Sequence, residues 1–187
     1  MRILFAVTAL MLMVATVAGA SSLELVANGD FELPQTTGWS QNIAGSSLFI
    51  TRSTTYDPDA DYEVKTSSSN GHGNARLWQQ VTIPSTDVYI GARLKGLAYD
   101  GGGAWCASGL ILTYLDVNGA PLGKTAIAAT SSICPWTEDD TFHIIPLTTS
   151  WVDYGFMLDD ELANLPGIDP DDVRELEVML LTTASNC

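Results

Sequence analysis

The stretch "ARLWQQVTI", residues 75–83, alternates between apolar and polar side chains. Successive side chains of a β-strand point to opposite faces of the sheet. One face therefore takes the apolar set, with Gln79 among it: Ala75, Leu77, Val81 and Ile83. The other face takes Arg76, Trp78, Gln80 and Thr82. The pattern predicts a half-buried strand that carries Trp78 away from the core.

The same alternation, separated by turn residues, recurs along most of the chain. We expect strands at residues 23–27, 47–52, 75–83, 88–99, 109–117, 123–128, 142–147, 151–158 and 173–182. The Asn118-Gly119 pair predicts a tight hairpin between two of them. The carboxylate-rich stretch 159–165 is the one expected helix, and the Ser- and Gly-rich stretch 65–74 is expected to be a mobile, exposed loop. The sequence thus predicts an all-β, two-sheet antiparallel β-sandwich with one short helix.

The first twenty residues have the features of a secretory signal. Arg2 precedes an apolar run that begins at Ile3, and small residues stand at Ala18 and Ala20. We expect cleavage after Ala20 rather than a membrane anchor, because a polar stretch follows a short apolar core. Residues 21–187 then form one domain, located outside the cell or in the cell envelope, with no membrane insertion after cleavage.

The composition argues against several classes of function. The net charge is −14, and the eight Lys and Arg residues are scattered, whereas a nucleic-acid surface needs clustered cations. Catalysis is also disfavoured, because no pair among the 22 acidic residues is singled out and no nucleophile motif is present. We therefore expect a non-catalytic domain.

Three cysteines stand in a chain expected to reach an oxidising compartment. Cys106 and Cys134 flank the expected hairpin, so a disulfide between them would join its base. Cys187, the last residue of the sequence, would then be a free thiol or await a partner beyond this sequence.

A candidate sugar-binding face follows from the strand pattern. Sugar rings offer apolar C–H faces to aromatic side chains and hydroxyls to polar groups. Along the stretch 88–99, Tyr89 and Arg93 should face outward, as does Lys95. If the two strands are adjacent, the predicted ligand-binding residues share one surface: Arg76, Trp78, Gln80, Tyr89 and Arg93. The alternative is that Trp78 packs under a loop or the helix, and Trp105 and Trp136 either contact ligand or shield the disulfide.

Three segments together resemble a known family. The segments "LVANGDFE…GW", "ARLWQQVTIPSTDVYIGARLKG" and "WVDYGFMLDDELANLPGIDPDDVRELEVMLLT" are similar to the β-sandwich carbohydrate-binding modules of the galactose-binding-like group. The resemblance covers nearly all of residues 21–187 and implies a jelly-roll sandwich. Since this sandwich serves many partners, the fold follows more directly than the ligand.

The resemblance also implies roles for the first segment. Phe31 would fill the core, while Asp30 and Glu32 would supply oxygen ligands to a structural Ca²⁺. Trp39 would pack over one end of the core. The family's final strand, with its further acidic residue, has no counterpart before Cys187. Either the chain is truncated, or another segment closes the sheet, or a sheet edge stays open.

The sequence therefore predicts a secreted, non-catalytic domain that binds a polysaccharide or another glycan through an aromatic and polar sheet face. The alternative is a structural or adhesive β-sandwich that binds protein or envelope components, and a glycoside hydrolase or lyase is the third reading. The exposure of Trp78 and Tyr89 separates the first two.

Overall fold

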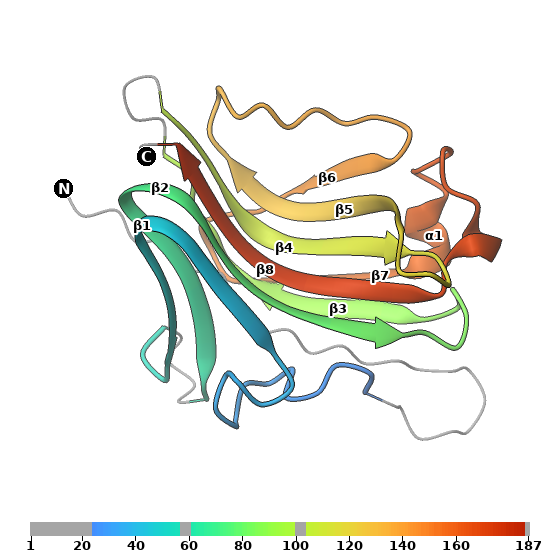
Figure 1. The fold of residues 1–187 in the computed structure, drawn as a ribbon, viewed down its shortest axis with the longest axis horizontal. Helices are drawn as coiled ribbons and strands as arrows, with labels where there is room; N and C mark the ends of the chain where they lie inside the picture. The colour runs from blue at the N-terminus through green and yellow to red at the C-terminus, as the bar shows by residue number, and fades with distance from the viewer. Residues whose placement is uncertain (1–23, 57–60, 100–103, 186–187) are drawn as a thin grey trace.

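The computed structural model describes residues 24–56, 61–99 and 104–185, which form two layers of β-structure (Figure 1). The expected signal segment and Cys187 lie outside the described residues. The strands are β1 (Ser40–Ser53), β2 (Glu63–Thr82), β3 (Tyr89–Leu94), β4 (Trp105–Leu115), β5 (Pro121–Thr130), β6 (Phe142–Pro146), β7 (Val152–Met157) and β8 (Glu175–Ser185). The helices are α1 (Leu158–Leu162) and a 3₁₀ turn at Pro170–Asp172. In the described part of the chain, no helix is long and apolar enough to cross a membrane.

The larger layer is a six-stranded sheet in the order β1-β2-β8-β4-β5-β6, and the smaller is the pair β3-β7. Neighbouring strands are antiparallel except for β5 and β6, which are parallel. The smaller sheet lies behind the larger one in Figure 1. This arrangement confirms the predicted all-β sandwich.

The core lies between the two layers, and the alternation of β2 places its residues as predicted. Leu77 is fully buried, and its neighbours Leu180 of β8 and Leu110 of β4 are buried beside it. From the smaller sheet, Ile90 and Leu94 pack against this set. Leu158 and Leu162 of α1 also belong to the core cluster, so the helix packs on the inner side of the sandwich.

β1 and β2 form a long, bent hairpin that extends beyond the strands predicted at 47–52 and 75–83. Residues 65–68 are buried in β2, so the prediction of a mobile exposed loop at 65–74 is wrong. Gly45 and Gly73 face each other at the bend with φ of 126° and 116°. A Cβ on Gly73 would lie 1.9 Å from the carbonyl oxygen of Ala44, so only glycine permits this approach. The Ser- and Gly-rich composition therefore marks a bend within a strand.

The segment before β1 joins the core without forming the strand predicted at 23–27. Its described residues are irregular. The Gln79 side chain faces inward among apolar residues and holds Ala27 by two hydrogen bonds of 2.8 Å. Its Oε1 accepts from the Ala27 backbone N–H, and its Nε2 donates to the Ala27 carbonyl. A side chain thus replaces the partner strand. Phe31 fills the core, and its ring centroid lies 5.1 Å from that of Trp39, which is also buried.

The β4–β5 hairpin forms as the Asn118-Gly119 pair predicts. Asp116 accepts hydrogen bonds from the backbone N–H groups of Asn118 and Ala120, and Gly119 has φ of 75°. The hydrogen bonds that the Asp116 carboxylate accepts from Ala120 and from Asn118 hold its pKa below its usual range.

The predicted disulfide at the base of this hairpin does not form: no disulfide joins Cys106 to Cys134 in this structure. Two hydrogen bonds between Cys106 and Ser131 join the base instead. The Cys106 N–H donates to Ser131 Oγ, and the Ser131 N–H donates to the Cys106 carbonyl. The Cys106 thiol packs with Ala184 and donates to the Tyr99 carbonyl at 3.5 Å. Since β4 already pairs through to residue 107, no further link is needed there.

Candidate functional site

The candidate binding surface is the side of the six-stranded sheet that faces away from β3 and β7, which we call the outer face. Arg76, Trp78 and Gln80 of β2 lie on it, as predicted. Strand register extends a row from Trp78 across the sheet: Met179, Ile111, Ala126 and Ile144. With strands about 4.8 Å apart, this row spans about 19 Å. The outer face is therefore apolar along a line that crosses five strands.

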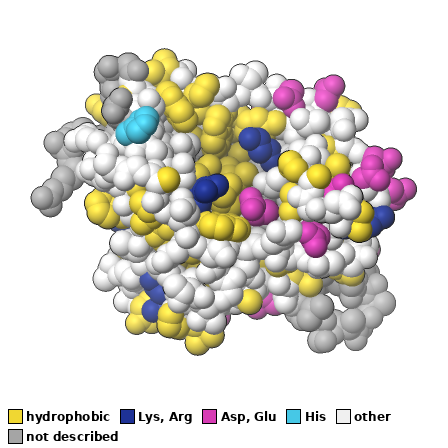
Figure 2. Space-filling model, viewed as in Figure 1, with side chains coloured by type: hydrophobic (Ala, Val, Ile, Leu, Met, Phe, Trp, Pro, Cys, Tyr) yellow, Lys and Arg dark blue, Asp and Glu magenta, His cyan; other side chains and the backbone are white. Residues whose placement is uncertain are grey.

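A second apolar cluster makes up the middle of the outer face. Its buried members are Ile111, Ala126, Ala128 and Phe142, and its partly buried members are Trp136, Ile144, Met179 and Leu181. Trp136, from the segment between β5 and β6, packs edge-on against Phe142 with ring centroids 5.9 Å apart. Figure 2 shows hydrophobic side chains gathered at the centre of this view. One aromatic side chain thus lies at each side of the apolar row.

Polar side chains border the row. The next row of the register contains Gln80, Glu177, Thr113 and Lys124. Gln80 donates to Glu175, and the Arg76 guanidinium lies 5.5 Å from the Trp78 ring centroid. Dark blue and magenta side chains border the hydrophobic centre in Figure 2. This surface combines ring-stacking and hydrogen-bonding groups, which sugar recognition requires.

Trp78 itself is half-buried, and α1 lies on the opposite side of the sheet. The reading in which the helix covers Trp78 therefore does not apply. Trp105 is also half-buried, and its register with Ser185 of β8 places it near one end of the outer face.

The structure separates Tyr89 and Arg93 from the other predicted binding residues. They belong to β3, which pairs with β7 in the smaller sheet and not with β2. Tyr89 is 38% exposed, and its ring lies over Gly155 of β7. The prediction that Tyr89 and Arg93 share one surface with Trp78 is therefore wrong, because the stretch between β2 and β3 passes from one layer to the other.

The residues expected to bind calcium are engaged in other contacts. Asp30 Oδ1 accepts from the backbone N–H of Glu32 at 3.2 Å, and Glu32 Oε1 accepts from the N–H of Tyr62 at 2.9 Å. No group of three or more acidic, His or Cys side chains suited to a metal occurs among the described residues. The carboxylates therefore close turns, and they do not converge.

The Arg52 guanidinium donates hydrogen bonds to the carbonyl oxygens of the same turn. Arg52 Nε donates to the Phe31 carbonyl at 2.6 Å, and a terminal nitrogen donates to the Glu32 carbonyl at 2.8 Å. The guanidinium also lies 3.2 Å from the Tyr62 ring centroid. Because carbonyls and carboxylates are the ligands calcium needs, the turn as folded does not fit a calcium ion. Calcium binding stays a prediction of the resemblance, and no functional step is assigned to it.

A buried polar network, which the sequence did not reveal, links α1 to β4, β5 and β6. Glu161 is only 4% exposed. Its Oε1 accepts from Thr125 Oγ1 at 2.5 Å and lies 2.7 Å from His143 Nδ1, and its Oε2 accepts from Asn164 at 3.2 Å. Thr125 also bonds the Tyr114 hydroxyl at 2.6 Å. These contacts satisfy both carboxylate oxygens, so the network stabilises the fold.

Burial in this network raises the pKa of Tyr114 well above its usual range; the nearby Glu161 charge adds to the effect, and the bond with Thr125 opposes it. The other nitrogen of His143 lies 3.8 Å from Glu138, a residue of the segment that carries Trp136. No sequence motif indicates this network, since Thr125 and Glu161 are 36 positions apart.

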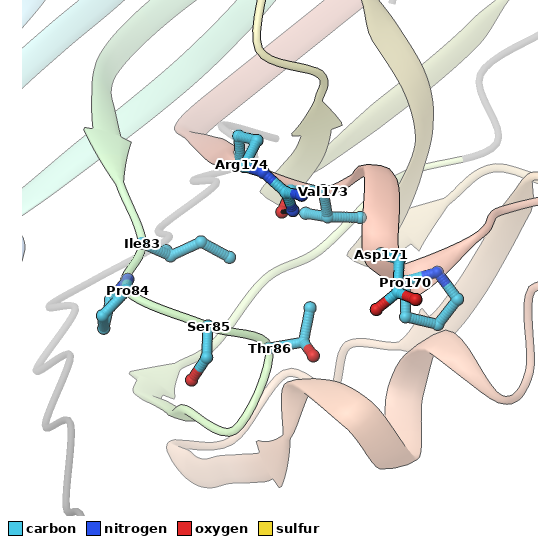
Figure 3. Close-up of a pocket in the computed structure, with 8 residues that line it drawn as sticks. All are labelled: Ile83, Pro84, Ser85, Thr86, Pro170, Asp171, Val173 and Arg174. Carbon is cyan, nitrogen blue, oxygen red and sulfur yellow. Dashed lines mark hydrogen bonds between the residues drawn. The ribbon is translucent and has the colours of Figure 1, made fainter.

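One pocket of about 290 Å³ lies between the β2–β3 connection and the 3₁₀ turn. Figure 3 shows Ile83 and Val173 pointing into it, with Asp171 at its rim. A backbone hydrogen bond from the Ile83 N–H to the Arg174 carbonyl joins the two segments that line the pocket. Asp171 and Arg174 are its charged lining residues, and we assign it no chemistry.

Comparisons with known proteins identify no family. No protein-family model matches the chain, and no curated protein matches its sequence. Among solved structures, the chain is similar to the enzymatically active domain of tailspike protein 4 of bacteriophage CBA120, with a TM-score of 0.33 and 12% identity. The match covers 87% of this chain and 20% of that one, so the chain spans about a fifth of its length. A likeness at this level carries no functional argument.

Proposed function

We propose that the chain is a secreted, non-catalytic domain that binds a polysaccharide or another glycan on the outer face. The observation that carries this proposal is the apolar row from Trp78 to Ile144, bordered by hydrogen-bonding side chains on the face that the second sheet leaves uncovered. Aromatic rings stack on sugar C–H faces, and Gln80, Thr113 and Lys124 offer partners to hydroxyls.

The length of the row favours an extended ligand. Ile111 and Ala126 in the middle of the row are buried, so ligand contact falls on its partly buried members Trp78, Met179 and Ile144, which are spread over about 19 Å. Trp78 and Trp136 lie toward opposite ends of this row, and Arg76 supports the Trp78 ring. We therefore expect affinity to rise with oligosaccharide length until the row is covered.

The proposed partner is uncharged or weakly charged, and nucleic acid is excluded from the proposal. The chain has a net charge of −14, and the outer face mixes Arg76 and Lys124 with Glu175 and Glu177. Such a surface lacks the cation cluster that phosphate backbones require.

Fluorescence titration tests the proposal. The domain is titrated with soluble glucans, xylans, mannans and galactans, and the same titration is run on Trp78→Ala. The matched control is Tyr89→Ala, which removes an exposed aromatic from the other sheet. Saturable binding that Trp78→Ala weakens at least tenfold and Tyr89→Ala leaves unchanged is expected. Equal loss in both variants, or a flat response from folded protein across the panel, contradicts the proposal. Release of reducing ends would contradict its non-catalytic part.

A structural or adhesive role is the second candidate. It is favoured by β1, an edge strand of the larger sheet on which Ile43 and Phe49 are 49% and 50% exposed. An open edge can pair with a strand of another chain. Concentration-dependent self-association that Ile43→Lys abolishes, together with a flat glycan response, would favour this role.

Secretion is the remaining part of the proposal and rests on residues 1–20. Mass spectrometry of the exported protein is expected to find Ser21 at the N-terminus. Retention of Met1 in the mature protein would contradict it.

A further inference from the structure

The connection between β5 and β6, residues 131–141, runs along the β6 edge of the larger sheet, and we call it the arm. Figure 1 shows it on the side of β6 that faces away from β5. Hydrogen bonds fix both of its ends. The Ser131 N–H donates to the Cys106 carbonyl of β4 at 2.9 Å, and Asp139 and Phe142 exchange two backbone hydrogen bonds of 3.0 and 3.2 Å. The position of its middle part then depends on further contacts.

The middle of the arm reaches the outer face through Trp136. The half-buried indole packs edge-on against Phe142 and belongs to the same apolar cluster as Ile144. Trp78, at the other end of the apolar row, is instead part of a strand. Strand pairing sets the position of Trp78, whereas the position of Trp136 depends on how the arm is attached to the sheet.

One side chain of the arm bonds the edge strand directly. Glu138 Oε1 accepts from the backbone N–H of Ile144 at 3.0 Å. Edge strands carry backbone N–H groups that no neighbouring strand takes, and a carboxylate takes one of them here. The same oxygen lies 3.8 Å from Nε2 of His143, whose Nδ1 lies 2.7 Å from the buried Glu161. The arm is therefore connected through Glu138 to β6 and to the network below it.

This contact joins the arm to the binding row itself, because Ile144 is the last member of the row. A hydrogen bond from a backbone N–H to a carboxylate is stronger than one to a neutral acceptor. We propose that Glu138 is a positioning residue of the glycan-binding face, which sets glycan affinity by fixing Trp136 beside Ile144. The inference rests on the proposed glycan function, since it assigns Glu138 a role at that same face.

Three variants separate position from charge. Glu138→Ala removes the acceptor, and Glu138→Gln retains a side-chain oxygen that can accept the same N–H. The matched control is Asp140→Ala, which removes one negative charge from an exposed position of the same arm and leaves the bond to Ile144 in place. Amide hydrogen exchange of Ile144 and the indole N–H signal of Trp136 are measured by NMR without glycan. The fluorescence titration then gives the glycan Kd of each variant.

In Glu138→Ala, we expect the Ile144 amide to exchange at least about tenfold faster, because its acceptor is lost. The Trp136 signal should shift, while the Trp39 signal from the core stays in place and shows that the variant is folded. The glycan Kd should rise about three- to tenfold, because the ring must then be ordered on binding. Glu138→Gln and Asp140→Ala should stay within about twofold of wild type in exchange and in Kd.

Several results would overturn the inference. An unchanged Ile144 exchange rate and Trp136 signal in Glu138→Ala would show that this carboxylate does not fix the arm. Equal weakening in Glu138→Ala and Asp140→Ala would show an effect of charge alone. Loss of binding on Trp78→Ala without any change on Glu138→Ala would overturn this inference and leave the proposed function in place. A folded wild type that binds no glycan would overturn both, and the exchange data would then show separately whether Glu138 holds the arm.

Discussion

Replacing Arg52 by Met should destabilise the protein substantially. The change removes two hydrogen bonds from the guanidinium to the carbonyls of Phe31 and Glu32 and its contact with the Tyr62 ring. Hydrogen bonds to charged groups contribute about 1.5–3 kcal/mol each, and a cation–π contact at a partly exposed site about 0.5–1 kcal/mol. Because Arg52 is half-buried, the lower values apply, and together they predict a loss of about 3.5 kcal/mol.

Urea unfolding followed by tryptophan fluorescence measures this loss, since Trp39 packs on Phe31. The matched control is Arg76→Met, which removes a cation from the Trp78 ring at 5.5 Å and should cost less than about 0.5 kcal/mol. If Arg52→Met is as stable as the control, the guanidinium does not hold the turn and the reasoning is refuted.

Urea unfolding also tests whether the protein binds calcium. If Arg52 holds the turn in place of a cation, EDTA should leave the unfolding midpoint of wild type unchanged, and added Ca²⁺ should not raise it. A midpoint that falls with EDTA and recovers with Ca²⁺ would show instead that the calcium implied by the resemblance binds.

Three further changes have expected outcomes. Gly73→Ala should cost about 2 kcal/mol or more in urea unfolding, because the residue has φ of 116° and no room for a Cβ; a loss below about 0.5 kcal/mol would show that the bend relaxes. Tyr114→Phe should weaken the loss of stability above about pH 10. The pKa of Tyr114 is raised in the folded state, so stability falls as the pH rises and the unfolded tyrosine ionises; an unchanged alkaline profile would contradict this. Thiol labelling of the native protein should modify Cys134 but not the buried Cys106, with no effect of reductant on the melting temperature, whereas reductant-dependent stability would indicate a disulfide.

Local pattern was sufficient for the strand around Trp78 and for its faces. The alternation there depends only on the geometry of a single strand, so it predicted the second half of β2 and the outward direction of Trp78. The Asn118-Gly119 turn is equally local. Phe31 and Trp39 were expected in the core and are buried there.

Local pattern failed where distant segments meet. The connection from Ile83 to Val88 could belong to a hairpin or to a crossing between layers, and the alternation of Tyr89 is the same in both. Its course is set by the Arg174 carbonyl, which accepts from the Ile83 N–H. The sequence therefore could not show that Tyr89 belongs to a different surface from Trp78.

Composition was misleading at the bend of β2. Gly73 was interpreted as part of a flexible loop, but its approach to β1 requires a residue without Cβ. The calcium ligands Asp30 and Glu32 are implied by the resemblance and stay a prediction; the sequence did not show that Arg52, 20 positions after Glu32, donates to the Glu32 carbonyl. The Glu161 network was missed for the same reason, because its members converge only in the folded chain.

The most direct test of the binding face is an NMR titration that follows the indole N–H signals of the five tryptophans, with the glycan that binds best in the fluorescence panel. The account predicts that the signals of Trp78 and Trp136 on the outer face shift with one saturation curve, while those of Trp39 in the core and Trp151 beside the smaller sheet do not move. Shifts confined to Trp151, or a glycan that binds without moving Trp78, would contradict the proposed binding face.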